Sequence, residues 1–149
     1  MRRFCRFDAS WLFLSQRGLA QSHSGFPMDI VAGPMPQPVM DGGRARLLYE
    51  LHITNVGPIP IEVVALDVYG DDGAMPLASY RGEAFGKVLV PAENVLVSVE
   101  STDRRDQRGQ IGEGHGAVIF VDLMLDAGAR APMKLRHRFT FDIRGNAAL

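Results

Sequence analysis

Alternation of apolar and polar residues with a period of two is the strongest constraint on this chain. In the segment 44–55 the predicted core-facing residues are Leu47, Tyr49, Leu51 and Ile53. The predicted solvent-facing residues of the same segment are Leu48, Glu50, His52 and Thr54. A period of two is typical of a strand with one buried face. Between residues 39 and 144 no window of 11 or more residues has a helical period, so the sequence predicts an all-β fold.

Further short segments of strand character follow, and turn residues separate them. We expect strands at 44–55, 61–69, 76–80, 87–90, 95–99, 117–125 and 134–144. This spacing, over about 105 residues, is typical of an immunoglobulin-like antiparallel β-sandwich of about seven strands. A β-barrel is the structural alternative. In the last segment His137 belongs to the apolar set, which predicts a packed ring with one hydrogen bond to the backbone.

The sequence before residue 39 differs from this β-rich domain, which we place at 39–144. Residues 1–25 hold four arginines and one aspartate, a charge of +3, on a chain whose net charge is -1. Basic residues followed by apolar residues 11–14 are typical of a secretory signal, although Asp8 and Ser10 interrupt the pattern. An irregular tail is the alternative. Residues 26–38 contain four prolines and predict an extended linker, and residues 145–149 form a C-terminal tail.

Composition excludes several function classes. A single cysteine permits neither an internal disulfide nor a zinc site made of cysteines. The apolar runs are far shorter than the roughly 20 residues of a membrane-spanning helix. Basic and acidic residues number 16 and 17, which is not the charge pattern of a nucleic-acid-binding protein. No catalytic motif is present, so we expect a non-enzymatic protein without a cofactor.

Two polar segments are the candidate contact surfaces for a ligand or protein partner. One is the solvent-facing set of the 44–55 strand, with Glu50, His52 and Thr54. The other is the polar loop 101–110, whose basic residues are Arg104, Arg105 and Arg108. Polar strand faces and long loops on a rigid scaffold are common recognition surfaces.

Two further functions stay open as alternatives. A small metal-dependent hydrolase would use His52 and His115 with Glu50 and Glu113, although an exposed Glu/His pair on a sheet face is the simpler interpretation. A self-associating structural domain would pair its edge strands. Three acidic residues around one turn, Asp67, Asp71 and Asp72, lack the spacing of a calcium loop and predict a hairpin turn with solvated carboxylates.

Several segments together carry a family resemblance. They are RLLYELHITN at 46–55, PIEVVALD at 60–67, VIFVDL at 118–123 and LRHRF at 135–139. The series resembles the β-rich N-terminal accessory region of bacterial lysostaphin/LytM-type zinc metallopeptidases. The family's zinc motifs, His-x-x-x-Asp and His-x-His, do not occur here, so the resemblance implies no peptidase activity.

The resemblance implies an accessory module of a cell-envelope or secreted protein. We therefore expect an extracytoplasmic location, periplasmic or secreted, and a partner that is a protein or a cell-wall component. The chain would stand alone or form the front part of a longer product. A cytoplasmic location is the alternative if residues 1–25 are not a signal.

Overall fold

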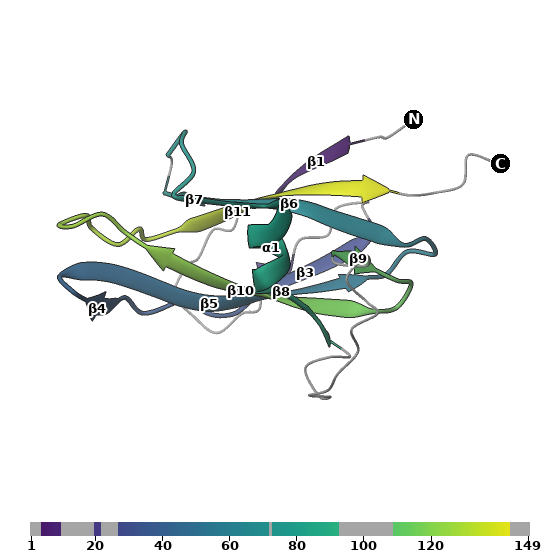
Figure 1. Cartoon of the computed structure of the whole chain (residues 1–149), viewed down its shortest axis with the longest axis horizontal. Coiled ribbons are helices and arrows are strands. Elements are labelled where there is room, and N and C mark those ends of the chain that lie inside the picture. The colour runs from purple at the N-terminus through teal and green to yellow at the C-terminus, as the bar shows by residue number, and fades with distance from the viewer. Residues whose placement is uncertain (1–3, 10–19, 22–26, 72, 93–108, 144–149) are drawn as a thin grey trace.

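The chain folds into two antiparallel β-sheets that face each other across an apolar core (Figure 1). The structure is a computed structural model that describes residues 4–9, 20–21, 27–71, 73–92 and 109–143. The first sheet, here called the β11 sheet, contains β1 (Phe4–Ala9), β11 (Leu135–Ile143), β6 (Ile61–Gly70) and β7 (Ala78–Arg81) in that order, with β9 (Gln110–Ile111) also on β6. The predicted all-β sandwich is confirmed.

The second sheet, here called the β5 sheet, has β5 and β10 at its centre. Its order is β2 (Ala20–Gln21), β3 (Met28–Ala32), β5 (Arg44–Asn55), β10 (Gly116–Met124) and β8 (Leu89–Pro91), and β4 (Val39–Asp41) also pairs with β5. A short helix, α1 (Gly82–Val88), connects β7 of one sheet with β8 of the other. In Figure 1, α1 lies between the upper β11 sheet and the lower β5 sheet.

The spatial order of the strands is that of an immunoglobulin sandwich. The order β3-β5-β10-β8 matches the immunoglobulin order A-B-E-D, and β7-β6-β11-β1 matches C′-C-F-G. In an immunoglobulin domain strand G follows strand F along the chain. Here β1, from the N-terminal end of the sequence, occupies the G position next to β11.

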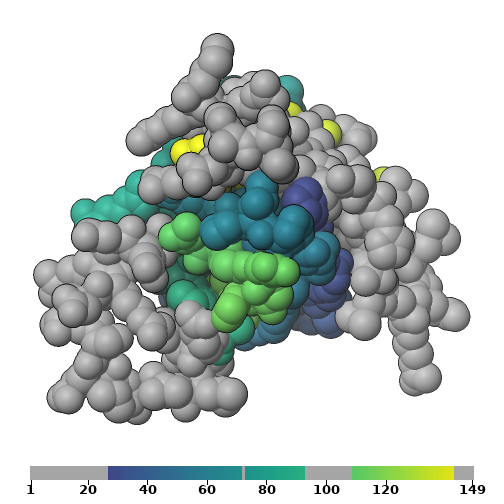
Figure 2. Space-filling model, turned by 90° about the vertical axis from the view of Figure 1, so that its right-hand side faces the viewer, coloured from purple at the N-terminus to yellow at the C-terminus, as the bar shows by residue number. Residues whose placement is uncertain are grey.

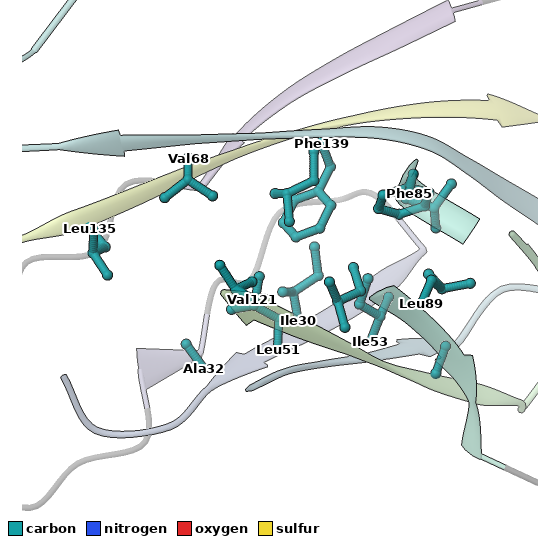
Figure 3. Close-up of a cluster of buried hydrophobic side chains, with 14 of the residues drawn as sticks. Ile30, Ala32, Leu51, Ile53, Val68, Phe85, Leu89, Val121, Leu135 and Phe139 are labelled. Atoms are coloured by element: carbon teal, nitrogen blue, oxygen red, sulfur yellow. The ribbon is translucent and has the colours of Figure 1, made fainter. Parts of the chain in front are cut away.

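The core consists of the inward residues of both sheets. Phe139 on β11 points toward Ile30, Leu51 and Val121 of the β5 sheet (Figure 3). The helix adds Phe85, which is buried against the same cluster. A β-bulge interrupts the pairing of β6 with β11, because Thr140 is opposite Ala65 whereas Phe141 is opposite Val63. The bulge changes which residues of β6 point into the core. Before it these residues are Ile61 and Val63, and after it they are Leu66 and Val68.

The N-terminal prediction is wrong at three places. Residues 28–32, expected within a linker, form β3, and Met28, Ile30 and Ala32 are buried in the core. This proline-free segment alternates apolar residues between Pro27 and Pro34, so the prolines flank the strand instead of interrupting it. Residues 4–9 and 20–21, expected in an irregular tail, form β1 and β2.

Two other predicted strands differ from the structure. Residues 82–88 are helical where a strand was expected to begin at residue 87, and β8 starts at Leu89. The helix has only seven residues, which is too short to show a helical period, and its Glu83 and Lys87 form an ion pair with 3.3 Å between Oε1 and Nζ. The strand predicted at 95–99 and the tail predicted at 145–149 lie outside the described residues.

Asn55 joins three segments at one end of the sandwich. Its buried side-chain amide donates from Nδ2 to the carbonyls of Ile59 and Ile111, at 2.7 and 3.0 Å, and its Oδ1 accepts from the N–H of Gly57 at 2.9 Å. Its backbone also bonds the hairpin between β9 and β10, through the carbonyl of His115. Figure 2 shows this end of the molecule, with the green β9–β10 hairpin against the β5–β6 connection.

Replacing Asn55 with alanine should lower the free energy of unfolding by about 2 kcal/mol. The change removes three side-chain hydrogen bonds, and the net contribution of such a bond to stability is about 0.5–1.5 kcal/mol. Urea titration followed by circular dichroism measures the loss. The control is Thr54→Ala, which removes the exposed neighbouring side chain and should change the value by less than about 0.5 kcal/mol. Equal losses would contradict the role given to Asn55.

Candidate binding face

The outer surface of the β5 sheet contains the residues of β5 that the sequence predicted as a contact surface. Alternation along β5 places Leu48, Glu50, His52 and Thr54 on the solvent side, as predicted. The register places Phe120 of β10 directly opposite Glu50. Leu48 and Phe120 are 53% and 43% exposed, which is high for large apolar side chains on two central strands. We call these five residues the β5–β10 face.

Most charges on and beside this face are paired with one another. His52 Nε2 lies 3.2 Å from Glu50 Oε2, and both side chains are about half exposed. Arg46 donates from Nε to Asp122 Oδ1 at 2.7 Å, and this hydrogen bond holds the pKa of the Asp122 carboxyl below its usual value. Exposed pairs of this kind contribute roughly 0–1 kcal/mol each. The apolar side chains are therefore the groups with most to gain from contact with a partner.

Replacing Glu50 and His52 together with alanine should leave the fold nearly intact. Both side chains are half exposed, and their exposed ion pair contributes little, so the expected change in unfolding free energy is below about 1 kcal/mol. A urea titration of the double variant beside the unmodified chain checks this. If the double variant unfolds without denaturant, the assignment of these residues to an outer face is wrong.

The other histidine of the proposed hydrolase lies elsewhere. His115 is in the turn before β10, where its Nδ1 donates to the Glu113 carbonyl at 2.8 Å. It lines a hollow of about 290 Å³ whose other described walls are apolar, glycine, proline and Gln110. The structure therefore brings Glu50 and His52 together and gives His115 different surroundings. Among the described residues, no group of three or more His, Cys, Asp or Glu is placed to hold a metal ion.

The second predicted contact surface is not placed by the structure. Arg104, Arg105 and Arg108 lie outside the described residues. The β5–β10 face is therefore the part of the predicted binding surface with a defined geometry.

The acidic residues near the β6–β7 turn do not form one solvated cluster. Asp67 is buried on β6, where its Oδ1 accepts from Ser79 Oγ at 2.6 Å and its Oδ2 accepts from Arg81 at 2.9 Å. Burial alone would raise the pKa of Asp67, but the hydrogen bonds from Arg81 and Ser79 outweigh it and lower the pKa. Asp71 instead accepts from the backbone N–H groups of residues 133 and 134. Asp72 lies outside the described residues.

His137 lies inside the sandwich, on the apolar face where the sequence placed it. Its Nε2 lies 2.7 Å from the hydroxyl of Tyr49, so the pair links β11 to β5 across the core. The predicted hydrogen bond to the backbone is replaced by this bond to a side chain, because the inward position faces the opposite sheet. Burial lowers the pKa of His137 to about 4, so the ring is neutral at pH 7.

Sequence reasoning missed Phe120 as a member of the face. Residues 117–125 were expected to form a central strand, and β10 is indeed central, but only one of its faces meets the core. The available signal was the alternation of Phe120 and Asp122 with the buried residues Ile119, Val121 and Leu123. In a strand this apolar, one exposed phenylalanine is easily counted with the core.

No protein-family model, curated protein or solved structure matches the chain. Within the described residues, no helix has the length and apolar character needed to cross a membrane. A function is therefore proposed from the residues and the geometry of the β5–β10 face.

Proposed function

We propose that the chain is a non-catalytic binding module of accessory type in a bacterial cell-envelope or secreted protein. The observation that carries this proposal is the exposure of Leu48 and Phe120 on the two central strands of the β5 sheet. A large apolar side chain on a rigid scaffold gains free energy when a partner removes it from water, at about 25 cal/mol for each Å² buried. The β5–β10 face is the surface proposed to meet the partner.

The neighbouring polar groups support a specific contact. Glu50, His52 and Thr54 offer donors and acceptors beside the two apolar residues, and a mixture of this kind is typical of interfaces between soluble proteins. The partner proposed from the resemblance is a protein or a cell-wall component of the envelope. The basic residues followed by an apolar stretch near the N-terminus support export. The segment would stay on the chain after export, because Phe4–Ala9 within it forms β1.

Photocrosslinking tests the proposed face. A photoreactive phenylalanine analogue placed at position 120, in the cells that naturally produce the chain, should give a discrete adduct upon illumination. The matched control carries the analogue at Met133, which is 71% exposed and does not belong to the face. The adduct from position 120 should be lost in a variant that also carries Leu48→Ala, Glu50→Ala and His52→Ala. The same adducts from both positions would contradict the proposal.

A compartment reporter tests the proposed location separately. Alkaline phosphatase fused after residue 149 becomes active only where its disulfides form, outside the cytoplasm. The full chain should give an active fusion, and a variant in which Arg2 and Arg3 are replaced by glutamate should give much less activity at equal protein level. An inactive fusion of the full chain would contradict the envelope location. It would not affect the proposed binding face, which the crosslinking experiment tests.

A further inference from the structure

The outer edge of β11 is covered by a strand from the opposite end of the chain. β1 pairs with β11 in an antiparallel ladder that runs from Phe4 opposite Asp142 to Ala9 opposite His137. The ladder extends over all six residues of β1. Without β1, this edge of β11 would present a row of unpaired N–H and C=O groups, which is a template for another strand.

β1 is separated in sequence from the rest of the sandwich. The next strand along the chain, β2, pairs with β3 in the β5 sheet, so residues 10–19 connect β1 to that sheet. A segment of this length spans up to roughly 35 Å when extended. The two sheets of a sandwich are only about 10 Å apart. The connection is therefore longer than the gap between the two sheets, which leaves length for β1 to reach beyond its own molecule.

The register shows which sequence suits this edge. His137, Phe139 and Phe141 point into the core and are buried, and the residues of β1 opposite them are Ala9, Phe7 and Cys5. Asp8 is opposite Arg138 in the register. Because opposite charges on directly facing positions favour pairing, the edge suits an extended segment with apolar residues at alternate positions and an acid opposite Arg138.

We infer that the β11 edge is a strand-acceptor site and that the partner it takes is the β1 segment of a second copy of this chain. Two molecules exchange residues 4–9 reciprocally, and each β11 sheet is completed by the other chain. The exchanged ladder contains the same residue pairs as the ladder within one chain, so the balance between monomer and dimer depends on concentration and on the entropy of association. This edge lies in the β11 sheet and is independent of the β5–β10 face.

Disulfide trapping between two variants tests the exchange. Both carry Cys5→Ser, one adds Arg6→Cys and the other adds Thr140→Cys, because residues 6 and 140 are directly opposite in the register. Cα atoms of opposite residues in an antiparallel pair lie about 4.5–5.5 Å apart, within the range of a disulfide. The variants are refolded together at several concentrations, oxidised and separated on a non-reducing gel. We expect a covalent heterodimer whose yield rises with concentration.

The matched control pairs the Arg6→Cys variant with Arg136→Cys, which lies four residues along the same side of β11. Its heterodimer yield should be at least tenfold lower. A single chain with both Arg6→Cys and Thr140→Cys reports the ladder itself, through a monomeric disulfide at low concentration. If this chain forms the disulfide but the mixture gives no heterodimer above the control, the exchange is overturned. If this chain forms no disulfide, the acceptor site is overturned as well.

A synthetic peptide of residues 3–10 gives a second measurement that needs no variant. Added in excess to the unmodified chain at high concentration, it should convert dimer into monomer in sedimentation velocity. A peptide with the same composition in scrambled order is the control. A chain that stays monomeric from about 5 to 500 µM, without peptide, would overturn the exchange.

Discussion

Replacing Phe139 with alanine should lower the free energy of unfolding by about 4 kcal/mol. Phe139 is fully buried, and its ring stacks on Phe141 with 5.8 Å between the centroids. It projects from β11 into the space between the two sheets (Figure 3). Truncating a buried phenylalanine removes its burial and leaves a cavity, which together cost about 3–5 kcal/mol.

The matched control is the same substitution at Phe120 on the outer side of β10. That side chain is 43% exposed, so Phe120→Ala should cost less than about 1.5 kcal/mol. Urea titrations of both variants at pH 7, at protein concentrations low enough to limit association, give the two values. Equal losses would show that both phenylalanines belong to the core and would remove the exposed apolar residue on which the binding proposal depends.

Lowering the pH from about 6.5 to about 4 should destabilise the fold by about 3 kcal/mol through His137 alone. Burial lowers the pKa of this histidine from 6.5 to about 4 in the folded chain. Between these two values the unfolded chain binds a proton at this position and the folded chain does not. Stability is therefore highest above pH 6.5 and falls as the pH decreases through this window.

Urea titrations from pH 7 to pH 4 measure this loss, and His137→Gln should flatten the profile because glutamine does not titrate. Asp67 does not enter this window: its pKa is lowered from 3.8, so its contribution is present above pH 3.8 and lost below it. A titration of the His137 ring by NMR gives an independent reading, and an ordinary pKa near 6.5 would contradict burial as the cause.

Strand positions were predictable wherever only one face of a strand meets the core. β5 has this pattern, and its sequence alone placed Leu47, Leu51 and Ile53 inside and Glu50 and His52 outside. The same reasoning placed His137 on the apolar side of β11. Burial of one face determines the alternation, so the alternation is visible without knowledge of the neighbouring strands.

Pairing partners and special positions were not predictable in this way. Alternation does not show which strand lies beside which, so neither β1 next to β11 nor Phe120 opposite Glu50 followed from the sequence. The bulge near Val64 adds one residue to β6. Beyond it, the positions that would point outward in a regular strand point into the core. Asp67 was misread for a related reason, because Ser79 and Arg81, which pair with it, come from the neighbouring strand β7.

Of the candidate site, the sequence predicted the polar half and missed an apolar member. Glu50, His52 and Thr54 were identified because polar residues stand out in an alternating strand. Phe120 was not identified, because β10 is apolar along most of its length. In such a strand the sequence does not distinguish an exposed phenylalanine from a buried one. Only the register of β10 on β5 shows which of its residues share the outer side.

The pairing of β5 with β10 has a consequence for how the protein forms during synthesis. The bond between Arg46 and Asp122 joins residues 76 positions apart in the sequence, and β6 and β11 are similarly distant. The centre of each sheet therefore needs a strand from each half of the chain, and neither sheet is complete until β10 and β11 have left the ribosome. Until then the apolar sides of β5 and β6 remain in water, so folding should be slow and nascent chains should depend on chaperones.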